Sequence, residues 1–481
     1  MELVTKKAMK CIQEADVIVY DNLIDISLLN YASLNTELIY AGKEAANHYL
    51  SQGSIIELLM DKAREGKYVV RLKGGDPYLF GRGSEEALAL KEAGISYEIV
   101  SGVTSSIAVP AYAGIPVTDR RFVSSCHIIT AHREDEAGID FENISKLEGT
   151  LVFMMGLAKL HHIVQGLTLH GKASDTPVAV LSDGSRYNRR KCVGTLADIE
   201  EKVKEAKLLP PAIIVVGEVV SLSNELDNFL ERYSDKKLFR KKILLTGTRY
   251  ICNKIKVALA DEGCDIDEIS IIESVPIESD FYNNIEKYIE SHDYLVFSSA
   301  NGIRVFFEKL KELHNVDLRK LSNIKFAVIG KGSAQTLRNY GYIADFVPSS
   351  FSNKDLAVEL CKQLKGEKLL LLRAREASTE LVEELEANKV EYTDVSLYET
   401  FRDYRRTFDI KRLIKNYDYV VVASSITAHT LCEMVEDKAL LEGRVLSIGP
   451  VTTGTCKRLG VEPLMSAREY SVDGIVRVLL Q

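Results

Sequence analysis

Short apolar runs alternate with amphipathic stretches through the first 130 or so residues of the chain. The strand-like runs are residues 15–21, 38–40, 68–72, 97–100 and 127–130. Helical spacing marks residues 54–65 and 85–93, and also residues 1–12, where Leu3, Ala8, Cys11 and Ile12 form the expected buried stripe. Strands separated by helices in this way indicate βαβ units around a mostly parallel sheet.

The pattern changes at residues 133–147, a polar and acidic stretch that separates this unit from the next. A second, smaller α/β unit is expected beyond it, with strands at residues 150–154, 177–181, 191–194 and 212–216. Residues 224–242 alternate in charge and contain few β-formers, which predicts a helical linker. The expected boundaries are therefore 1–132 for the first unit, 133–222 for the second and 223–240 for the linker.

The rest of the chain contains an internal repeat. Residues 293–299 recur at 418–425, residues 326–330 recur at 445–449, and residues 242–245 recur at 368–371. One α/β unit repeated twice predicts two similar lobes within residues 241–481, and clefts between lobes are favoured ligand sites. We expect lobe 1 at about 241–273 plus 402–481, and lobe 2 at about 274–401. The predicted fold class is α/β throughout.

Length and composition narrow the class of protein. A chain of 481 residues is expected to hold several domains, and a net charge of −8 argues against nucleic acid or an anionic membrane as the main partner. The eight cysteines are scattered without metal-type spacing, which predicts reduced thiols in a cytoplasmic protein and no metal site. No apolar run approaches the length needed to span a bilayer.

Residues 71–83 are the first candidate for chemistry, because they leave the predicted strand at 68–72 and lead into a helix. Gly74 and Gly75 allow a ligand to approach the main chain closely, and Asp76 adds a carboxylate beside them. Ligands bind outside the carboxyl ends of strands in open α/β sheets. From these residues alone, a tight turn without a ligand is nearly as good an interpretation.

Two families resemble the chain. The segments Val70–Pro77 (VRLKGGDP), 80–83 (FGRG) and 111–118 (AYAGIPVT) resemble the tetrapyrrole methylases, most closely uroporphyrinogen-III C-methyltransferase, and the resemblance runs from Met1 to about Leu222. From about Lys241 the chain resembles uroporphyrinogen-III synthase, through residues 296–302 (VFSSANG), 346–348 (FVP), 397–400 (LYET) and 448–450 (IGP). The two activities are consecutive steps of one pathway.

The methylase resemblance implies S-adenosylmethionine as cofactor. By that resemblance its contacts are Gly74, Gly75, Asp76, Leu79, Thr104, Ser105, Met155 and Gly184. A helix N-cap is an equally good interpretation of Thr104 and Ser105, and a core position is the alternative for Met155.

The resemblance also implies an acid–base pair for methylation of a pyrrole carbon. Asp21 matches the base that removes a proton from the cationic intermediate, and Lys43 matches the proton donor, although Lys43 could equally pair with a substrate carboxylate. The substrate carries many carboxylates, so Arg71, Arg82, Arg120 and Arg121 are candidate anion-binding residues, with solvated or salt-bridged arginines as the alternative.

The sequence departs from the methylase pattern in two places. The family opens with a strand and a Gly-x-Gly-Pro-Gly-Asp loop beside the cofactor, and the sequence given begins just after that loop. Either the start was placed too late, or the protein lacks one wall of its cofactor site. Asp119 stands where the family usually has His, which is expected to tune substrate contacts.

The synthase resemblance implies closure of hydroxymethylbilane to uroporphyrinogen III with inversion of ring D, without a cofactor or metal. Serine and threonine at the starts of predicted helices would offer N–H and hydroxyl groups to substrate carboxylates. The candidates are Ser298, Ser299, Asn301, Ser333, Ser424, Ser425 and Thr452. Tyr398 is the candidate acid for hydroxyl departure, with a buried structural tyrosine as the alternative.

The sequence therefore predicts a bifunctional cytoplasmic enzyme that methylates uroporphyrinogen III to precorrin-2 and also makes uroporphyrinogen III. The expected partners are small-molecule tetrapyrroles, and the methylase resemblance implies a homodimer. Two alternatives remain: a synthase with an inactive methylase half, and a tetrapyrrole-binding protein with neither activity. Sirohaem and cobalamin are both compatible end products.

Overall fold

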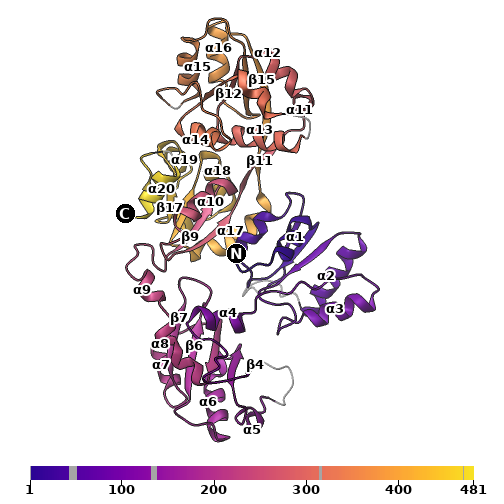
Figure 1. The fold of residues 1–481 in the computed structure, drawn as a ribbon, viewed down its shortest axis with the longest axis vertical. Coiled ribbons are helices and arrows are strands. Elements are labelled where there is room, and N and C mark those ends of the chain that lie inside the picture. Colours follow the sequence, from indigo (N-terminus) through magenta and orange to yellow (C-terminus); the bar gives the residue numbers. More distant parts are fainter. Residues whose placement is uncertain (1, 43–50, 132–137, 314–316, 351, 470) are drawn as a thin grey trace.

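The computed structural model of the protein describes residues 2–42, 51–131, 138–313, 317–350, 352–469 and 471–481. Four sheets with their helices form two α/β units in the first half of the chain and two lobes in the second (Figure 1). Within the described ranges, no helix is both long and apolar enough to cross a membrane.

The first unit is built on a parallel sheet in the order β2-β1-β3. Its strands are β1 (Val17–Tyr20), β2 (Glu37–Tyr40) and β3 (Val69–Leu72), and its helices are α1 (Lys6–Glu14), η1 (Ile26–Tyr31), α2 (Gln52–Arg64) and α3 (Gly83–Glu92). β1 is buried on both faces, as expected of a central parallel strand. Val17 and Val19 pack with α2, and Ile18 and Tyr20 face the other way.

Three expectations for this unit are wrong. Residues 97–100 form no strand, because no described strand lies beside them to complete a ladder. Residues 127–130 do form a strand, but it pairs with the second sheet. Leu3 is exposed because α1 begins only at Lys6, whereas Ile12 is fully buried.

The second unit has a mixed sheet in the order β4-β5-β8-β6-β7, in which β4 and β5 are parallel and the other pairs antiparallel. Its strands are β4 (Cys126–Thr130), β5 (Thr150–Met154), β6 (Pro177–Ser182), β7 (Arg190–Thr195) and β8 (Ala212–Val216). Its helices are α4 (Ser105–Tyr112), α5 (Phe141–Ile144), η2 (Leu157–Lys159), α6 (Leu160–Leu169), α7 (Ile199–Glu205) and η3 (Glu218–Leu222). The expected helical linker contains two short helices, α8 (Ser223–Leu226) and α9 (Phe229–Tyr233).

Lobe 1 carries the sheet β10-β9-β16-β17-β18. Its strands are β9 (Lys242–Thr246), β10 (Asp265–Ile269), β16 (Tyr419–Val422), β17 (Val445–Ser447) and β18 (Met465–Ser466). Its helices are α10 (Arg249–Ala258), η5 (Tyr404–Arg406), α17 (Thr407–Leu413), η6 (Ile414–Asn416), α18 (Ser425–Met434), η7 (Lys438–Leu441), α19 (Pro450–Arg458) and α20 (Val472–Leu479).

Lobe 2 carries the sheet β11-β15-β14-β12-β13. Its strands are β11 (Ile272–Pro276), β12 (Tyr294–Phe297), β13 (Lys325–Val328), β14 (Leu369–Ala374) and β15 (Tyr392–Arg402). Its helices are α11 (Asp280–Asn283), α12 (Ile285–Ser291), α13 (Ala300–Glu312), η4 (Leu318–Asn323), α14 (Lys331–Asn339), α15 (Asn353–Cys361) and α16 (Glu380–Ala387). The chain passes between the lobes twice, after β10 and after β15.

Each copy of the sequence repeat is divided between the two lobes. The order β9-β16-β17 in lobe 1 corresponds to β14-β12-β13 in lobe 2, and all four pairings are parallel. The first copy of the repeat supplies β9 to lobe 1 but β12 and β13 to lobe 2, and the second copy does the reverse. Each lobe is therefore assembled from parts of both copies, which explains the two crossings between lobes.

The first unit packs directly against lobe 1. One buried cluster contains Ile18, Tyr20 and Leu29 from the first unit together with Leu244 and Val420 from lobe 1. Figure 1 shows the first unit (indigo to purple) beside lobe 1, with the second unit at the bottom and lobe 2 at the top. The two halves of the chain therefore share a core.

Candidate functional sites

The first candidate site lies where β1 and β3 end. These strands are parallel, so Asp21 after β1 and Gly74 after β3 lie at the same edge of the sheet. A Cβ atom at Gly74 would lie 2.9 Å from the Leu23 carbonyl oxygen, which places this glycine against the Asp21 loop. Lys43, the expected proton donor after β2, lies outside the described residues.

The Gly74–Asp76 turn is joined to the loop before α4. Gly75 has a φ of 74°, and the Asp76 carboxylate accepts hydrogen bonds from the backbone N–H groups of Tyr78, at 2.9 Å, and Gly102, at 3.0 Å. Burial opposes ionisation of Asp76, but these bonds outweigh it and lower its pKa. Asp76 therefore holds two loops together, and Leu79 follows with its N–H bonded to the Asp76 carbonyl.

Thr104 is the N-cap of α4, which is the alternative to a cofactor contact that the sequence offered for it. Its hydroxyl accepts the Ser106 N–H at 3.4 Å, and α4 begins at Ser105. A Cβ atom at Gly75 would lie 3.9 Å from the Thr104 Cα atom, so the cap lies beside the glycine turn. The capping role leaves a ligand contact possible.

Met155 and Gly184 are at one edge of the second sheet, because β5 and β6 both run antiparallel to the β8 strand between them. Met155 is 52% exposed, which argues against the core position considered for it. Gly184 packs on Val109 of α4, where an added Cβ atom would lie 2.1 Å from Cγ1. α4 therefore connects this edge to Thr104.

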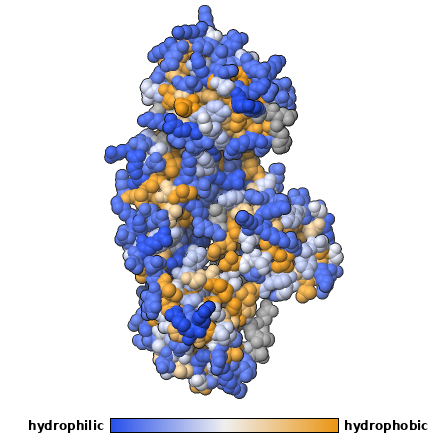
Figure 2. All heavy atoms as spheres, viewed as in Figure 1, coloured by the Kyte–Doolittle hydropathy of each residue, from blue (hydrophilic) through white to orange (hydrophobic). Residues whose placement is uncertain are grey.

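Strained backbone conformations with positive φ are frequent in and beside these loops. Seven described non-glycine residues have positive φ, and four of them, Phe80, Arg82, Met155 and Asp183, lie in or beside the predicted cofactor loops. Left-handed non-glycine residues cost about 1–3 kcal/mol each and cluster at functional sites. Large apolar side chains, including Leu23, Tyr78 and Val103, are exposed around the same loops. Figure 2 shows apolar surface where the first and second units approach each other.

The predicted arginines of this site are mostly paired. Arg71 forms an ion pair with Asp21 at 3.2 Å and lies 3.4 Å from the carboxylate of Glu86, which also binds Lys73 at 3.0 Å. Burial lowers the pKa of Lys73, and the neighbouring charge of Arg71 adds to this effect.

The other three candidate arginines lie nearer the surface. Arg82 binds Glu85 through two contacts of 2.8 Å, and Arg121 binds Asp119. Arg120 is exposed. Glu86 was not among the residues predicted from the sequence, although its buried carboxylate orders Arg71 and Lys73. It lies on the first turn of α3, where an acidic residue is usually exposed.

The second candidate site begins in lobe 2, where Tyr398 on β15 lies beside the start of α13. Tyr398, 5% exposed, shares a hydrogen bond of 2.9 Å with Ser299, which also caps α13. Burial raises the pKa of Tyr398, so its hydroxyl keeps its proton at neutral pH. Asn301 donates to Ser274 at 3.0 Å, and Ser298 precedes this group at the end of β12.

The remaining candidates follow strands in the same way. Ser424 caps α18 by accepting the Thr427 N–H at 3.1 Å, and Ser425 accepts a hydrogen bond from Thr455 of α19. Ser333 and Thr452 are buried near the starts of α14 and α19. The strands before these helices are parallel within each sheet, so their helix N-termini gather at the carboxyl edge of each lobe.

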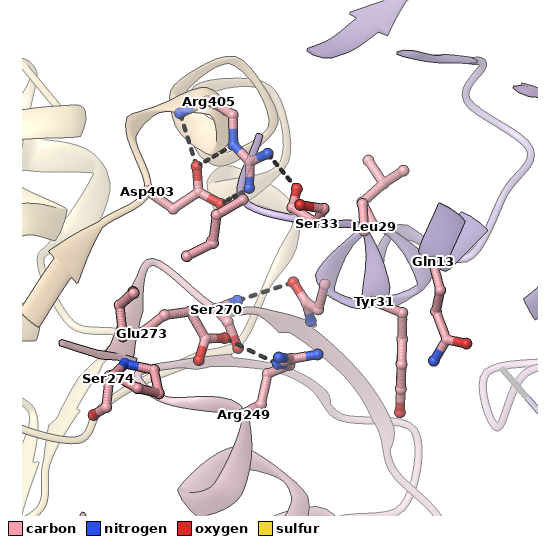
Figure 3. A pocket seen from close by; sticks show the side chains of 15 residues that line it. Gln13, Leu29, Tyr31, Ser33, Arg249, Ser270, Glu273, Ser274, Asp403 and Arg405 are labelled. Atoms are coloured by element: carbon pink, nitrogen blue, oxygen red, sulfur yellow. Dashed lines mark hydrogen bonds and ion pairs between the residues drawn. The ribbon is translucent and has the colours of Figure 1, made fainter. Parts of the chain in front are cut away.

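A separate cavity of about 310 Å³ lies between the two halves of the chain (Figure 3). It is lined by Gln13, Leu29, Tyr31 and Ser33 from the first unit and by Arg249, Ser270, Glu273, Asp403 and Arg405 beside the interlobe crossings. Both arginines in it are already paired, Arg249 with Glu273 and Arg405 with Asp403. Among the described residues, no group of three or more His, Cys, Asp or Glu could hold a metal ion.

Fold and site geometry together define an α/β protein of two halves that share a core, with candidate ligand sites at the carboxyl ends of parallel strands. Residues 1–200 match the family of Tetrapyrrole (Corrin/Porphyrin) Methylases, and residues 253–477 match Uroporphyrinogen-III synthase HemD. The chain belongs to both families: it is a fusion of a tetrapyrrole methylase with a uroporphyrinogen-III synthase domain.

Three relatives illustrate this relationship. The Porphyrin biosynthesis protein HemD of Ruminiclostridium josui is 34% identical over 486 residues, covering 100% of this chain and 95% of that protein. The S-adenosyl-L-methionine-dependent uroporphyrinogen III methyltransferase of Methanosarcina barkeri is 50% identical over 228 residues, covering 47% of this chain and 89% of that protein. The structure of Uroporphyrin-III C-methyl transferase from Thermus thermophilus complexed with S-adenyl homocysteine has a TM-score of 0.40 and 33% identity, covering 46% of this chain and 94% of that one.

Proposed function

We propose that the chain carries out two reactions on tetrapyrroles. The second half closes hydroxymethylbilane to uroporphyrinogen III with inversion of ring D, and the first half transfers methyl groups from S-adenosylmethionine to uroporphyrinogen III, giving precorrin-2. The observation that carries the proposal is similarity over the whole length to a relative in which both halves are present. Both alternatives with fewer activities are tested below.

The residues of the first site fit the proposed cofactor. Gly74 and Gly75 are exposed and present bare backbone, the Asp76 carboxylate fixes that backbone in place, and Met155 projects an exposed thioether from the facing unit. When bound there, S-adenosylmethionine supplies an electrophilic methyl group. The chain contributes the positioning of both reactants, which accounts for much of the acceleration in such transfers.

Asp21 is the proposed base for the proton that the methylated pyrrole loses. Its carboxylate lies at the edge of the sheet, and it accepts hydrogen bonds from the Leu23 N–H at 2.9 Å and from Arg71 at 3.2 Å. These bonds hold one orientation of the carboxylate. Substrate carboxylates would compete for Arg71, and their binding would release Asp21 to accept a proton.

Tyr398 is the proposed acid for loss of the hydroxyl group from hydroxymethylbilane. Its raised pKa keeps the phenol protonated, and its hydrogen bond with Ser299 fixes the hydroxyl at the start of α13. The N-termini of α13, α14, α18 and α19 would hold the carboxylates of the folded substrate through backbone N–H groups. We further propose that the protein works as a cytoplasmic homodimer through its methylase half.

The test starts from hydroxymethylbilane and the full chain, with and without S-adenosylmethionine labelled in its methyl group. The proposal predicts the type III isomer in both reactions and label in the tetrapyrrole only with the cofactor. Type III product without label would support the synthase-only alternative. Binding of uroporphyrinogen with neither turnover would support the binding protein, and formation of only the non-inverted isomer would refute the synthase activity.

A further inference from the structure

Arg304 is a partly buried cation that has no carboxylate partner among the described residues. It lies on α13 one turn after Asn301, and its guanidinium donates to the Asn301 side-chain oxygen. Its Nε atom is buried without a hydrogen-bond partner among the described residues. Burial lowers the pKa of Arg304, and the attraction of Glu308 offsets only part of this effect. A desolvated charge of this kind is costly unless something pairs with it.

The facing lobe contributes the other contacts of Arg304. Its guanidinium carbon lies 3.7 Å from the ring centroid of Tyr250, which belongs to α10 of lobe 1, and the Lys254 ammonium lies 4.5 Å from the same ring. We call Tyr250, Lys254 and Arg304 the Arg304 cluster. It places two cations on one aromatic ring, and no ion pair to a carboxylate joins either cation in the part of the chain that the structure describes.

The charges of the cluster act on its tyrosine. Burial opposes ionisation of Tyr250, but its hydrogen bonds with Lys254 and Thr336 and the charges of Lys254 and Arg304 prevail and lower its pKa. Thr248, the N-cap residue of the same helix, has a buried hydroxyl with no hydrogen-bond partner within the described ranges. The start of α10 therefore combines two cations, Lys254 and Arg304, with a hydroxyl donor, Thr248, that has no partner among the described residues.

The cluster adjoins the proposed reaction site. Asn301, which binds Arg304, is two residues from Ser299, and Ser299 binds the Tyr398 hydroxyl. The charge of Arg304 also lowers the pKa of Tyr398, although burial of that hydroxyl prevails. A ligand group bound by Arg304 would therefore lie close to the proposed acid and would touch both lobes.

We propose that the Arg304 cluster is a carboxylate-binding subsite, in which Arg304 binds a carboxylate of the linear substrate and thereby closes the two lobes around it. The inference rests on the proposed synthase function. A guanidinium offers a planar pair of donors to a carboxylate, and the Tyr250 ring keeps that plane in place. The competing explanation is that the cluster only joins the lobes and contacts no substrate.

The test measures initial rates of type III isomer formation by the full chain over a range of hydroxymethylbilane concentrations. Arg304→Gln removes the charge but keeps polar contact with Asn301. A lost charged hydrogen bond corresponds to about ten- to hundredfold in affinity, so KM is expected to rise by about that factor, with a smaller change in kcat. Arg304→Lys keeps the charge but loses the planar pair of donors. Its KM is expected to lie between the KM of wild type and that of Arg304→Gln.

The matched control is Arg338→Gln, which removes an exposed arginine from the same lobe. An unchanged KM in Arg304→Gln, or an equal rise in Arg338→Gln, would overturn the inference. If Arg304→Gln does not fold, Arg304→Lys decides, because a KM equal to that of wild type would equally overturn it. Failure of the wild-type chain to form type III isomer would instead refute the synthase function itself.

Discussion

Two groups of buried or partly buried charged residues differ in whether each charge has an ion-pair partner among the described residues. At the junction of the halves, Arg406 is 1% exposed and Asp409 is 0% exposed, and they form an ion pair at 3.1 Å. Arg406 also donates to Asn30 at 2.6 Å and to the Ile26 carbonyl at 3.1 Å, and the Tyr20 hydroxyl donates to Asp409 at 3.1 Å. We call Tyr20, Asn30, Arg406 and Asp409 the junction network.

The Arg304 cluster is the opposite case. Its cations face an aromatic ring, and a buried Nε atom has no partner among the described residues. A satisfied polar network fixes one arrangement of its elements, whereas an unsatisfied one retains the capacity to bind a group of opposite charge. The first network holds the methylase half on the synthase half, whereas the second has the unpaired charge that the proposed carboxylate subsite requires.

The largest expected effect comes from breaking the junction network. Arg406→Met removes the closer of the two cations beside the buried Asp409 and leaves only Arg412, whose guanidinium lies 3.5 Å from that carboxylate. Loss of one member of a buried pair costs about 3–5 kcal/mol. Urea denaturation followed by circular dichroism is expected to show that loss in the free energy of unfolding. Arg319→Met is the control, because Arg319 pairs with Asp317 at the surface, where an ion pair contributes about 0–1 kcal/mol. Equal losses in both variants would contradict the contrast.

Removal of the Tyr398 hydroxyl is expected to slow cyclisation without harming methyl transfer. General acid catalysis contributes about 10²–10⁴-fold, so Tyr398→Phe should lower kcat for type III isomer formation by about hundredfold or more. Burial raises the pKa of Tyr398 above its ordinary value of 10.0, so the protonated form prevails through neutral pH and the wild-type rate should fall only as pH rises beyond that value. A purely structural tyrosine would leave kcat nearly unchanged.

The paired loops of the methylase site provide the converse test. A methyl group at Gly102 would lie 2.2 Å from the Gly75 carbonyl oxygen, so Gly102→Ala must displace the Gly74–Asp76 turn. A displacement of about 1 Å can cost about hundredfold in rate. Methyl transfer to added uroporphyrinogen III should fall by up to that factor while cyclisation continues. Gly94→Ala, in open space with positive φ, is the control for backbone strain without a clash.

The smallest effect is expected from Arg304 itself. Arg304→Met removes a desolvated charge that has no carboxylate partner in the described part of the chain, and apolar replacement of such a group is often neutral or stabilising. The free energy of unfolding is therefore expected to stay the same or rise by about 1 kcal/mol. A loss as large as that of Arg406→Met would identify the cluster as structural.

Local patterns predicted most of the strands, the duplicated lobes and the Gly74–Asp76 turn. They could not assign residues 127–130 to a sheet, because the pattern of a buried strand carries no information about its neighbours. Residues 97–100 have a strand-like composition but no described neighbour with which to form a ladder. The repeat predicted two lobes, and the strand order shows which strands of each copy lie in each lobe.

Local motifs likewise identify some of the site residues but not the contacts between them. Motifs bring Asp21, Gly74 and Thr104 to attention, but the pairing of Arg71 with Asp21 and Glu86 depends on which strands are adjacent. Arg406 and Asn30 lie 376 positions apart, so no local signal could connect them. Arg304 was missed because one arginine on an amphipathic helix resembles a solvated position. Its spacing of three from Asn301 is the one signal that could have indicated it.

The most direct test of the contrast between the two networks measures stability and substrate affinity in the same two variants. Arg406→Met and Arg304→Gln are compared with wild type for the free energy of unfolding and for the KM of hydroxymethylbilane. The prediction is a crossed pattern: Arg406→Met loses stability and keeps its KM, and Arg304→Gln keeps its stability and raises its KM. Parallel changes of both quantities in both variants would contradict the account.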